Sequence, residues 1–173
     1  MTKLRLKNLI IGVLILIGAL SAKATTPPEI QIDTATFAIK INNKPVDHTK
    51  FNDLLTIMDR EYRKVDKSDK TLYIFDEFGF IIIKEKKGIT YSFLFSKGTT
   101  IDEPKSAFNV ILNINQLPIN LNTPTIDLKN QLPTAEKSIL LESMFIYVNK
   151  KFITMGESKD GKFTRLDLGY KAK

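Results

Sequence analysis

The sequence feature that most constrains the fold is an internal repeat, whose landmarks recur at an offset of 73 positions (114 minus 41). Residues 41–46 read INNKPV and residues 114–119 read INQLPI, so an apolar strand end, a polar turn and a proline recur at this offset. Gly88 and Gly161 recur at the same offset, each inside a charged turn. Landmarks that keep one offset across the whole unit predict a tandem duplication.

The repeated unit is too short to form two independent domains. The repeats cover residues 37–96 and 108–170, and a unit of about 70 residues with one helix and one sheet face is marginal by itself. A glycine and a proline mark residues 97–106 as the connector between the repeats. We therefore expect residues 37–173 to form a single domain.

Apolar periodicity predicts the elements of each unit. Residues 37–41 alternate as in a half-buried strand, and an apolar stripe at helical spacing follows within residues 47–62. Three strands separated by turns come next, at residues 71–75, 80–84 and 89–95. The second unit repeats this order, with a helix from Thr123 to before Pro133 and strands at residues 143–148, 152–155 and 162–168. The expected fold class is α+β: a tandem duplication of a strand-helix-three-stranded antiparallel meander unit, with the helices packed on one face of antiparallel sheet.

The N-terminal segment, residues 1–24, has the pattern of a cleaved secretory signal. A basic start without acidic residues precedes an unbroken apolar run at positions 9–20, and small residues follow at positions 22 and 24. The alternative is a membrane anchor, but a spanning helix needs about 20 apolar residues, which is more than this run provides. We therefore expect cleavage after Ala24, export to the periplasm and no stable membrane insertion of the mature chain. That chain then opens with an extended leader at residues 25–36.

Composition argues against several classes of function. The signal segment holds four of the 26 basic residues and none of the 19 acidic ones, so the mature chain keeps 22 basic residues and a net charge of +3. A nucleic-acid binder needs a clustered basic face, and only short pairs such as Lys86 with Lys87 occur here. The chain has no cysteine, which excludes disulfides, thiolate chemistry and a lipoprotein anchor.

No residue cluster in the sequence has the spacing of a catalytic, metal or cofactor site. His48 is the only histidine, and a zinc site needs further histidine or cysteine ligands. Asp76 and Glu77 are adjacent carboxylates in an expected turn, so ordinary turn chemistry is their first interpretation. Phe78 is next to them and is either an exposed interface anchor or packed over the hairpin. We expect no enzyme activity and no cofactor, and Asp76, Glu77 and Phe78 are the candidate partner-contact residues.

The residues around the first helix resemble a family of small exported bacterial proteins. INNKPV at residues 41–46 and YIFDEFGF at residues 73–80 are similar to that family's Asn-Gly-Lys before the helix and its Trp-Asp-Asp-Leu-Gly-Ile type turn after it. Some members look like immunity proteins, which protect a bacterium from antibacterial effectors such as those delivered by type VI secretion. The resemblance covers residues 37–168, and this chain departs from it at Asn43 and Phe75. The repeated unit also resembles, in fold alone, a protein inhibitor of β-lactamase.

The resemblance implies a periplasmic immunity protein that binds and neutralises a cognate toxin acting in the cell envelope. The expected partner is this protein toxin, and no nucleic-acid partner is expected. Two alternatives stay open at this point. One is a non-enzymatic envelope housekeeping or assembly protein, and the other is a hydrolase whose site has no recognisable motif.

Overall fold

The computed structural model describes residues 26–36, 38–47, 50–86, 88–132, 137–140, 144–148 and 152–171. The expected export signal at residues 1–24 and His48 lie outside these residues. The first half contains β1 (Glu29–Asp33), β2 (Ala38–Ile41), β3 (Lys44–Pro45), α2 (Phe51–Met58), β4 (Arg63–Asp66), β5 (Lys70–Phe75), β6 (Phe80–Glu85) and β7 (Gly88–Leu94). The second half contains β8 (Ile111–Ile114), β9 (Leu117–Ile119), α3 (Thr125–Gln131), β10 (Lys137–Leu140), β11 (Met144–Val148), β12 (Phe152–Lys159) and β13 (Lys162–Lys171).

The small sheet has five strands in the order β3-β2-β1-β8-β9. Its central strand β1 runs antiparallel to β2 and parallel to β8, so it joins the two halves of the chain. Ile30 and Ile32 of β1 are buried, and the alternation of buried and more exposed residues along β1 is that of a strand with one face on the core. The expectation of a leader outside the fold at residues 25–36 is therefore wrong, because residues 29–33 complete a sheet.

The large sheet has eight strands in the order β10-β11-β12-β13-β7-β6-β5-β4. Two four-stranded antiparallel meanders meet edge to edge where β7 pairs with β13, with Phe93 opposite Leu166. The sequence predicted three strands in each meander, whereas the structure has four. In the first half the missed strand is β4, a charged edge strand without clear apolar alternation. The fold is thus broadly α+β, with more sheet than helix in the part that the structure describes.

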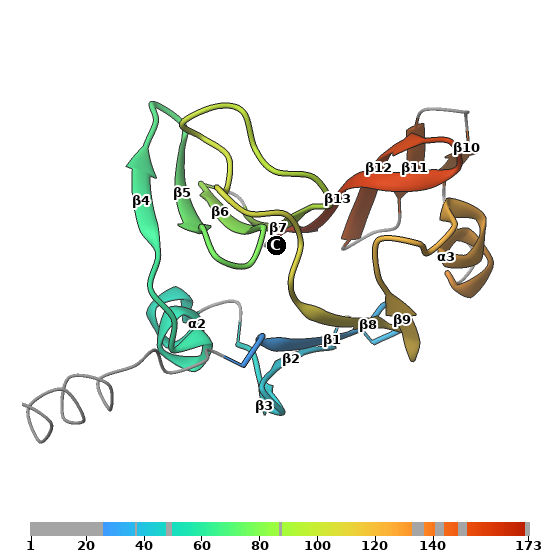
Figure 1. Ribbon diagram of the computed structural model, residues 1–173. Coiled ribbons are helices and arrows are strands. Elements are labelled where there is room, and N and C mark those ends of the chain that lie inside the picture. Colours follow the sequence, from blue (N-terminus) through green and yellow to red (C-terminus); the bar gives the residue numbers. More distant parts are fainter. Residues whose placement is uncertain are drawn as a thin grey trace, which may run out of the picture.

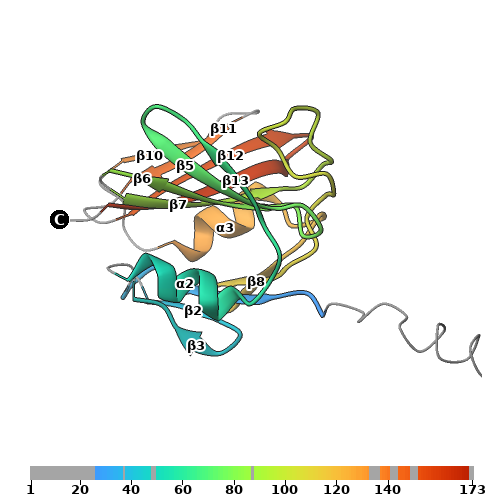
Figure 2. The ribbon, with the colours of Figure 1, turned by 90° about the vertical axis from the view of Figure 1, so that its left-hand side faces the viewer.

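One hydrophobic core spans both sheets and both helices. It contains Ile30 and Ile32 from the small sheet, Leu54 and Leu128 from the helices, and the aromatic inner face of the large sheet. Figures 1 and 2 show the two helices at the level between the two sheets. A smaller cluster lies on the other face of strands β5 to β7 and contains Leu72, Ile74, Ile81, Ile83 and Leu94.

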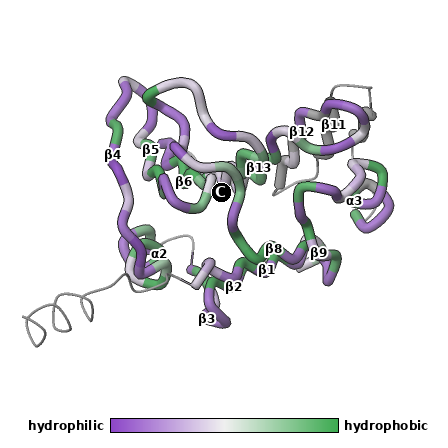
Figure 3. Tube along the Cα trace, viewed as in Figure 1, coloured by the Kyte–Doolittle hydropathy of each residue, from purple (hydrophilic) through white to green (hydrophobic). Residues whose placement is uncertain are grey.

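Three of the four sheet edges, β3, β9 and β4, carry residues that discourage further strand pairing. Pro45 and Pro118 lie in β3 and β9, the two edge strands of the small sheet, and proline lacks the N–H that a new neighbour would need. Figure 3 shows hydrophilic residues dominating β3 and the edge strand β4 of the large sheet. Of the described helices, α2 has eight residues and α3 has seven, too few to span a membrane.

Two equivalent asparagines hold the ends of β1, and we call them the asparagine clamps. Asn42 accepts a hydrogen bond from the Glu29 amide (3.1 Å) and donates to the Ile57 carbonyl at the end of α2 (3.5 Å). Asn115 accepts from the Thr34 amide (2.8 Å) and donates to the Gln131 carbonyl at the end of α3 (2.7 Å). Both asparagines have a left-handed backbone, with φ of 51° and 50°, which asparagine tolerates better than most residues. Each clamp thus ties β1 to one hairpin and one helix.

The clamp at Asn115 predicts that its side-chain hydrogen bonds, and not only its backbone conformation, stabilise the fold. Asn115→Gly keeps a residue that favours positive φ but removes three hydrogen bonds, to Thr34 and to Gln131. We expect a loss of about 1–2 kcal/mol in the free energy of unfolding, measured by urea denaturation. The control is Gln116→Gly in the same turn, where φ is 69° and the residue is exposed; it should leave stability unchanged or raise it, because glycine adopts a positive φ without steric cost. Equal stability of Asn115→Gly and the unchanged protein would contradict the clamp.

Candidate functional site at the connector between the two halves

The segment between β7 and β8, residues 95–110, is called the connector below. Figure 1 shows it leaving the end of β7, reaching the β4 side of the large sheet and returning downwards to β8. It contains no helix or strand. Loops of more than about 12–15 residues without secondary structure are uncommon in compact domains and are usually either functional or disordered. The contacts of this loop decide between these two cases.

The returning half of the connector is hydrogen-bonded along the turn at residues 76–79. The amide of Ser106 donates to the Asp76 carbonyl and the amide of Asn109 to the Phe78 carbonyl, both at 3.0 Å. Gly79 permits this approach, because a Cβ at Gly79 would lie 2.3 Å from the nitrogen of Phe108 and its φ is +62°. The expected turn at these residues is therefore the surface on which the connector rests.

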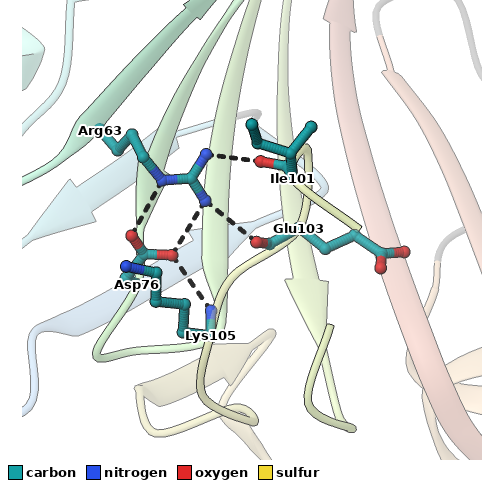
Figure 4. Close-up of polar contacts among 5 residues, drawn as sticks. All are labelled: Arg63, Asp76, Ile101, Glu103 and Lys105. Carbon is teal, nitrogen blue, oxygen red and sulfur yellow. Dashed lines mark hydrogen bonds and ion pairs between the residues drawn. The ribbon is translucent and has the colours of Figure 1, made fainter. Parts of the chain in front are cut away.

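Arg63 of β4 links this turn to the outer half of the connector (Figure 4). Its guanidinium forms a bidentate pair with Asp76, with both N···O distances 3.1 Å. The same guanidinium donates to the carbonyls of Ile101 and Glu103, and Asp76 also accepts from the Lys105 amide at 3.1 Å. Bidentate arginine–carboxylate pairs fix geometry as well as charge. Arg63 and Asp76 therefore hold three connector residues at once.

The charges of this pair stabilise each other. The guanidinium of Arg63 is the main reason that the pKa of Asp76 lies below its ordinary value, while partial burial works in the opposite direction. The same contact raises the pKa of Arg63. Their side chains are 29% and 23% exposed, so water screens the pair less than it screens a fully exposed one. Asp76 consequently stays ionised and keeps accepting hydrogen bonds at neutral pH.

The outermost turn of the connector, residues 98–104, is called its tip, and it is also held by hydrogen bonds among its own residues. The Glu103 carboxylate accepts hydrogen bonds from the amides of Thr99 (2.8 Å) and Thr100 (3.1 Å), and these two contacts lower the pKa of Glu103. The Gly98 amide donates to the Pro104 carbonyl at 3.0 Å and closes the turn at its base. The connector is therefore an ordered loop, with contacts on both sides of its tip.

The three residues expected to contact a partner have different environments. Asp76 is half-buried and engaged with Arg63 and the connector. Phe78 is 2% exposed and belongs to the core, so the packed alternative is right and the exposed anchor is wrong. Glu77 is exposed. The turn thus supports the loop beside it, and its counterpart at residues 149–151 lies outside the described residues.

A second feature is an open groove of about 770 Å³ on the outer face of the small sheet. Its lining is mostly polar or small: Gln31, Ile32, Asp33, Ala35, Ala38, Lys40, Asn113, Asn115 and Gln116. Asp33 accepts hydrogen bonds from the amides of Thr36 and Ala35, and the Thr36 amide is the main cause of its lowered pKa. Across the described residues, no three His, Cys, Asp or Glu side chains are grouped so as to hold a metal ion.

Sequence reasoning missed Arg63, Ile101 and Glu103 at this site. Arg63 lies in a run of charged residues that gave no strand signal, and its pairing with Asp76 spans 13 positions. The length of the connector was the one sequence signal that could have directed attention to Ile101 and Glu103.

The first prediction from this site concerns the order of the connector. Arg63→Ala removes the charged partner of Asp76 and the donors to the Ile101 and Glu103 carbonyls. We expect about 2 kcal/mol less stability and roughly tenfold faster trypsin cleavage after Lys97 or Lys105 under native conditions. The control is Arg165→Ala, which breaks a pair with Asp167 on β13. If both variants are cleaved at the same rate, Arg63 does not brace the connector.

The second prediction is a pH dependence. A carboxyl group whose pKa is lower in the folded than in the unfolded state stabilises the fold above its unfolded pKa, and this stabilisation is lost as pH falls through the folded value. Asp76→Asn should therefore cost about 1–2 kcal/mol at pH 7 and much less at pH 3. Urea unfolding of both proteins at the two pH values measures this. If Asp76→Asn lowers the free energy of unfolding by the same amount at pH 7 and at pH 3, the ionised carboxylate of Asp76 is not responsible for the loss.

Comparison with known proteins places this chain in a family without assigning a function. A family model described as "Domain of unknown function (DUF7738)" matches residues 30–129. No curated protein and no solved structure matches. The matched region begins in β1, includes Arg63, the turn at residues 76–79 and the whole connector, and ends in α3. It covers 100 of the 173 residues. The chain belongs to the DUF7738 family.

Proposed function

We propose that this chain is a periplasmic immunity protein, which binds and neutralises a cognate antibacterial toxin acting in the cell envelope. Effectors delivered by type VI secretion are the expected kind of toxin. The protein works by binding a partner and carries out no reaction of its own. The observation that carries the proposal is the ordered connector: a long loop in an exposed position, held by contacts on both sides of its tip.

The loop supports binding because ordered loops lose little conformational entropy when a partner engages them. Surface loops held by a rigid scaffold often carry function, and this one stands on an eight-stranded sheet. The export pattern in residues 1–24 supports a partner that acts outside the cytoplasm. The resemblance of residues 37–168 to a family of small exported bacterial proteins, some of which look like immunity proteins, supports the class of partner.

We also propose that the domain arose by tandem duplication, with the helices on one face of the large sheet. Both halves have the same order of elements: hairpin, helix and four-stranded meander. Phe93 and Leu166, which pair where the two meanders meet, are themselves 73 positions apart (166 minus 93). Asn42 and Asn115 have the same offset and make corresponding contacts. The connector and β1 lie outside the repeated elements, so each occurs once in the domain.

The test is protection of cells from a toxin. An effector encoded beside this gene is directed to the periplasm and expressed with and without the full chain. We expect survival only with the full chain, and no survival with a version that lacks residues 2–24, because that version stays in the cytoplasm. Immunoblots of cell fractions control for the amount and location of each version.

Two outcomes would contradict the proposal. Equal killing with and without the full chain would remove the immunity function and favour the alternative of an envelope housekeeping or assembly protein. Protection by the version without residues 2–24 would contradict a periplasmic site of action.

A further inference from the structure

We infer that the tip of the connector is the element that enters the toxin, with Ile101 as its anchor in an apolar pocket. This inference rests on the proposed function and specifies its contact surface. The partner that it fits is an enzyme toxin with an apolar substrate pocket wide enough for one branched aliphatic side chain.

Ile101 is the starting observation. It is 77% exposed, whereas Tyr62, Ile111, Leu121 and Ile126, the other exposed large hydrophobic residues among those described, are between 43% and 49% exposed. A single exposed hydrophobic residue is normal on a protein surface and needs no explanation by itself. What distinguishes Ile101 is the set of contacts made by the residues around it.

These contacts fix the main chain at the tip and leave the Ile101 side chain free. Arg63 donates to the carbonyl of Ile101 itself and to that of Glu103. On the next residue, the Asp102 carboxylate forms an ion pair with Lys67 at 2.7 Å. Figure 4 shows the Ile101 carbonyl directed at the guanidinium, and Ile101 itself is 77% exposed. The main chain is therefore held by β4 and the loop after it, while the side chain faces outwards.

The tip is also held from inside by the Glu103 carboxylate. This one group accepts from the amides of Thr99 and Thr100, the two residues before Ile101. At the base of the tip, a Cβ on Gly98 would lie 2.3 Å from the Cβ of Glu103, so the two sides of the loop are in close contact there. A loop with these contacts is close to its bound geometry before it meets a partner, which is the condition for a tight rigid inhibitor.

The chemistry of the tip specifies the pocket. One exposed aliphatic side chain stands between polar residues of the chain: Thr99 and Thr100 precede it, and Asp102, which pairs with Lys67, follows it. Enzyme substrate pockets are concave and mostly apolar, with a few polar groups, so they match a protruding Ile101 inside a polar rim. Binding energy at such interfaces is concentrated in a few central anchors, and Ile101 is the candidate here.

The experiment compares Ile101→Asp with a matched substitution elsewhere. Ile111→Asp is the control, because Ile111 is also an exposed isoleucine but lies in β8 on the small sheet. Each variant is made in the full chain. Each is co-expressed with the periplasmic effector described above, and its purified mature form is titrated against a catalytically inactive form of that effector. Thermal unfolding of each variant shows that it is folded.

We expect Ile101→Asp to weaken binding about 100-fold and to abolish protection without a change in the melting temperature. Ile111→Asp should bind with an affinity within about threefold of that of the unchanged protein. Ile101→Val should keep most of the affinity, because an aliphatic branched side chain remains.

If the unchanged protein binds and Ile101→Asp binds equally well, the inference fails and the proposed function stands. If Ile111→Asp weakens binding as much, the small sheet is the contact surface and the inference also fails. If the unchanged protein neither binds nor protects, the proposed function itself fails.

Discussion

The structure depends on the position of β1 between two hairpins that come from different halves of the chain. Without β1, the strands β2 and β8 would have no partner on their inner edges, and the small sheet would consist of two isolated hairpins, which are marginal in water. The asparagine clamps fix both ends of β1 and link each end to the helix of the same half. The buried isoleucines of the small sheet then close one side of the core. The relative position of the two halves follows from this strand and from the pairing of β7 with β13.

The connector is the other segment that crosses between the halves, and its contacts differ in kind from those of β1. β1 is held by ladder hydrogen bonds and buried side chains along its whole length. The connector has buried side chains at its two ends, Phe95 and Val110, whereas its middle is held by the ion pair of Asp102 with Lys67, by Arg63 and Asp76, by the Glu103 carboxylate and by main-chain contacts with a turn. The contacts of the middle part order an exposed segment without burying it. This is the physical reason that the connector can present Ile101 to solvent, and why we place the contact with a partner there. The groove on the small sheet has no comparable apolar anchor among its lining residues.

Much of the fold was predictable from local pattern. The strands β5, β6 and β7 and the helix α2 have clear apolar periodicity, and their positions were expected to within a few residues, although α2 is shorter than its apolar stripe. β1 and β4 were missed because their signals are weak in isolation: β1 has only two buried apolar residues, and β4 is mostly charged. Both become strands because neighbouring strands offer them hydrogen-bond partners. At the site, Asp76 was identified from the sequence, but its pairing with Arg63 was not, since Arg63 is brought to Asp76 only by the pairing of β4 with β5.

The sequence by itself determined the two-fold recurrence of elements, the apolar faces that make the core, the absence of disulfides and the polar turns that begin at Asn42 and Asn115. These properties depend on residue type and spacing, which are local. Only the tertiary structure decided that residues 29–33 complete a sheet, that Phe78 is buried, and that Arg63, Asp76 and Glu103 order the connector around Ile101. These properties depend on contacts between segments far apart in the chain, and the free energy of such contacts is available only after the sheets have formed.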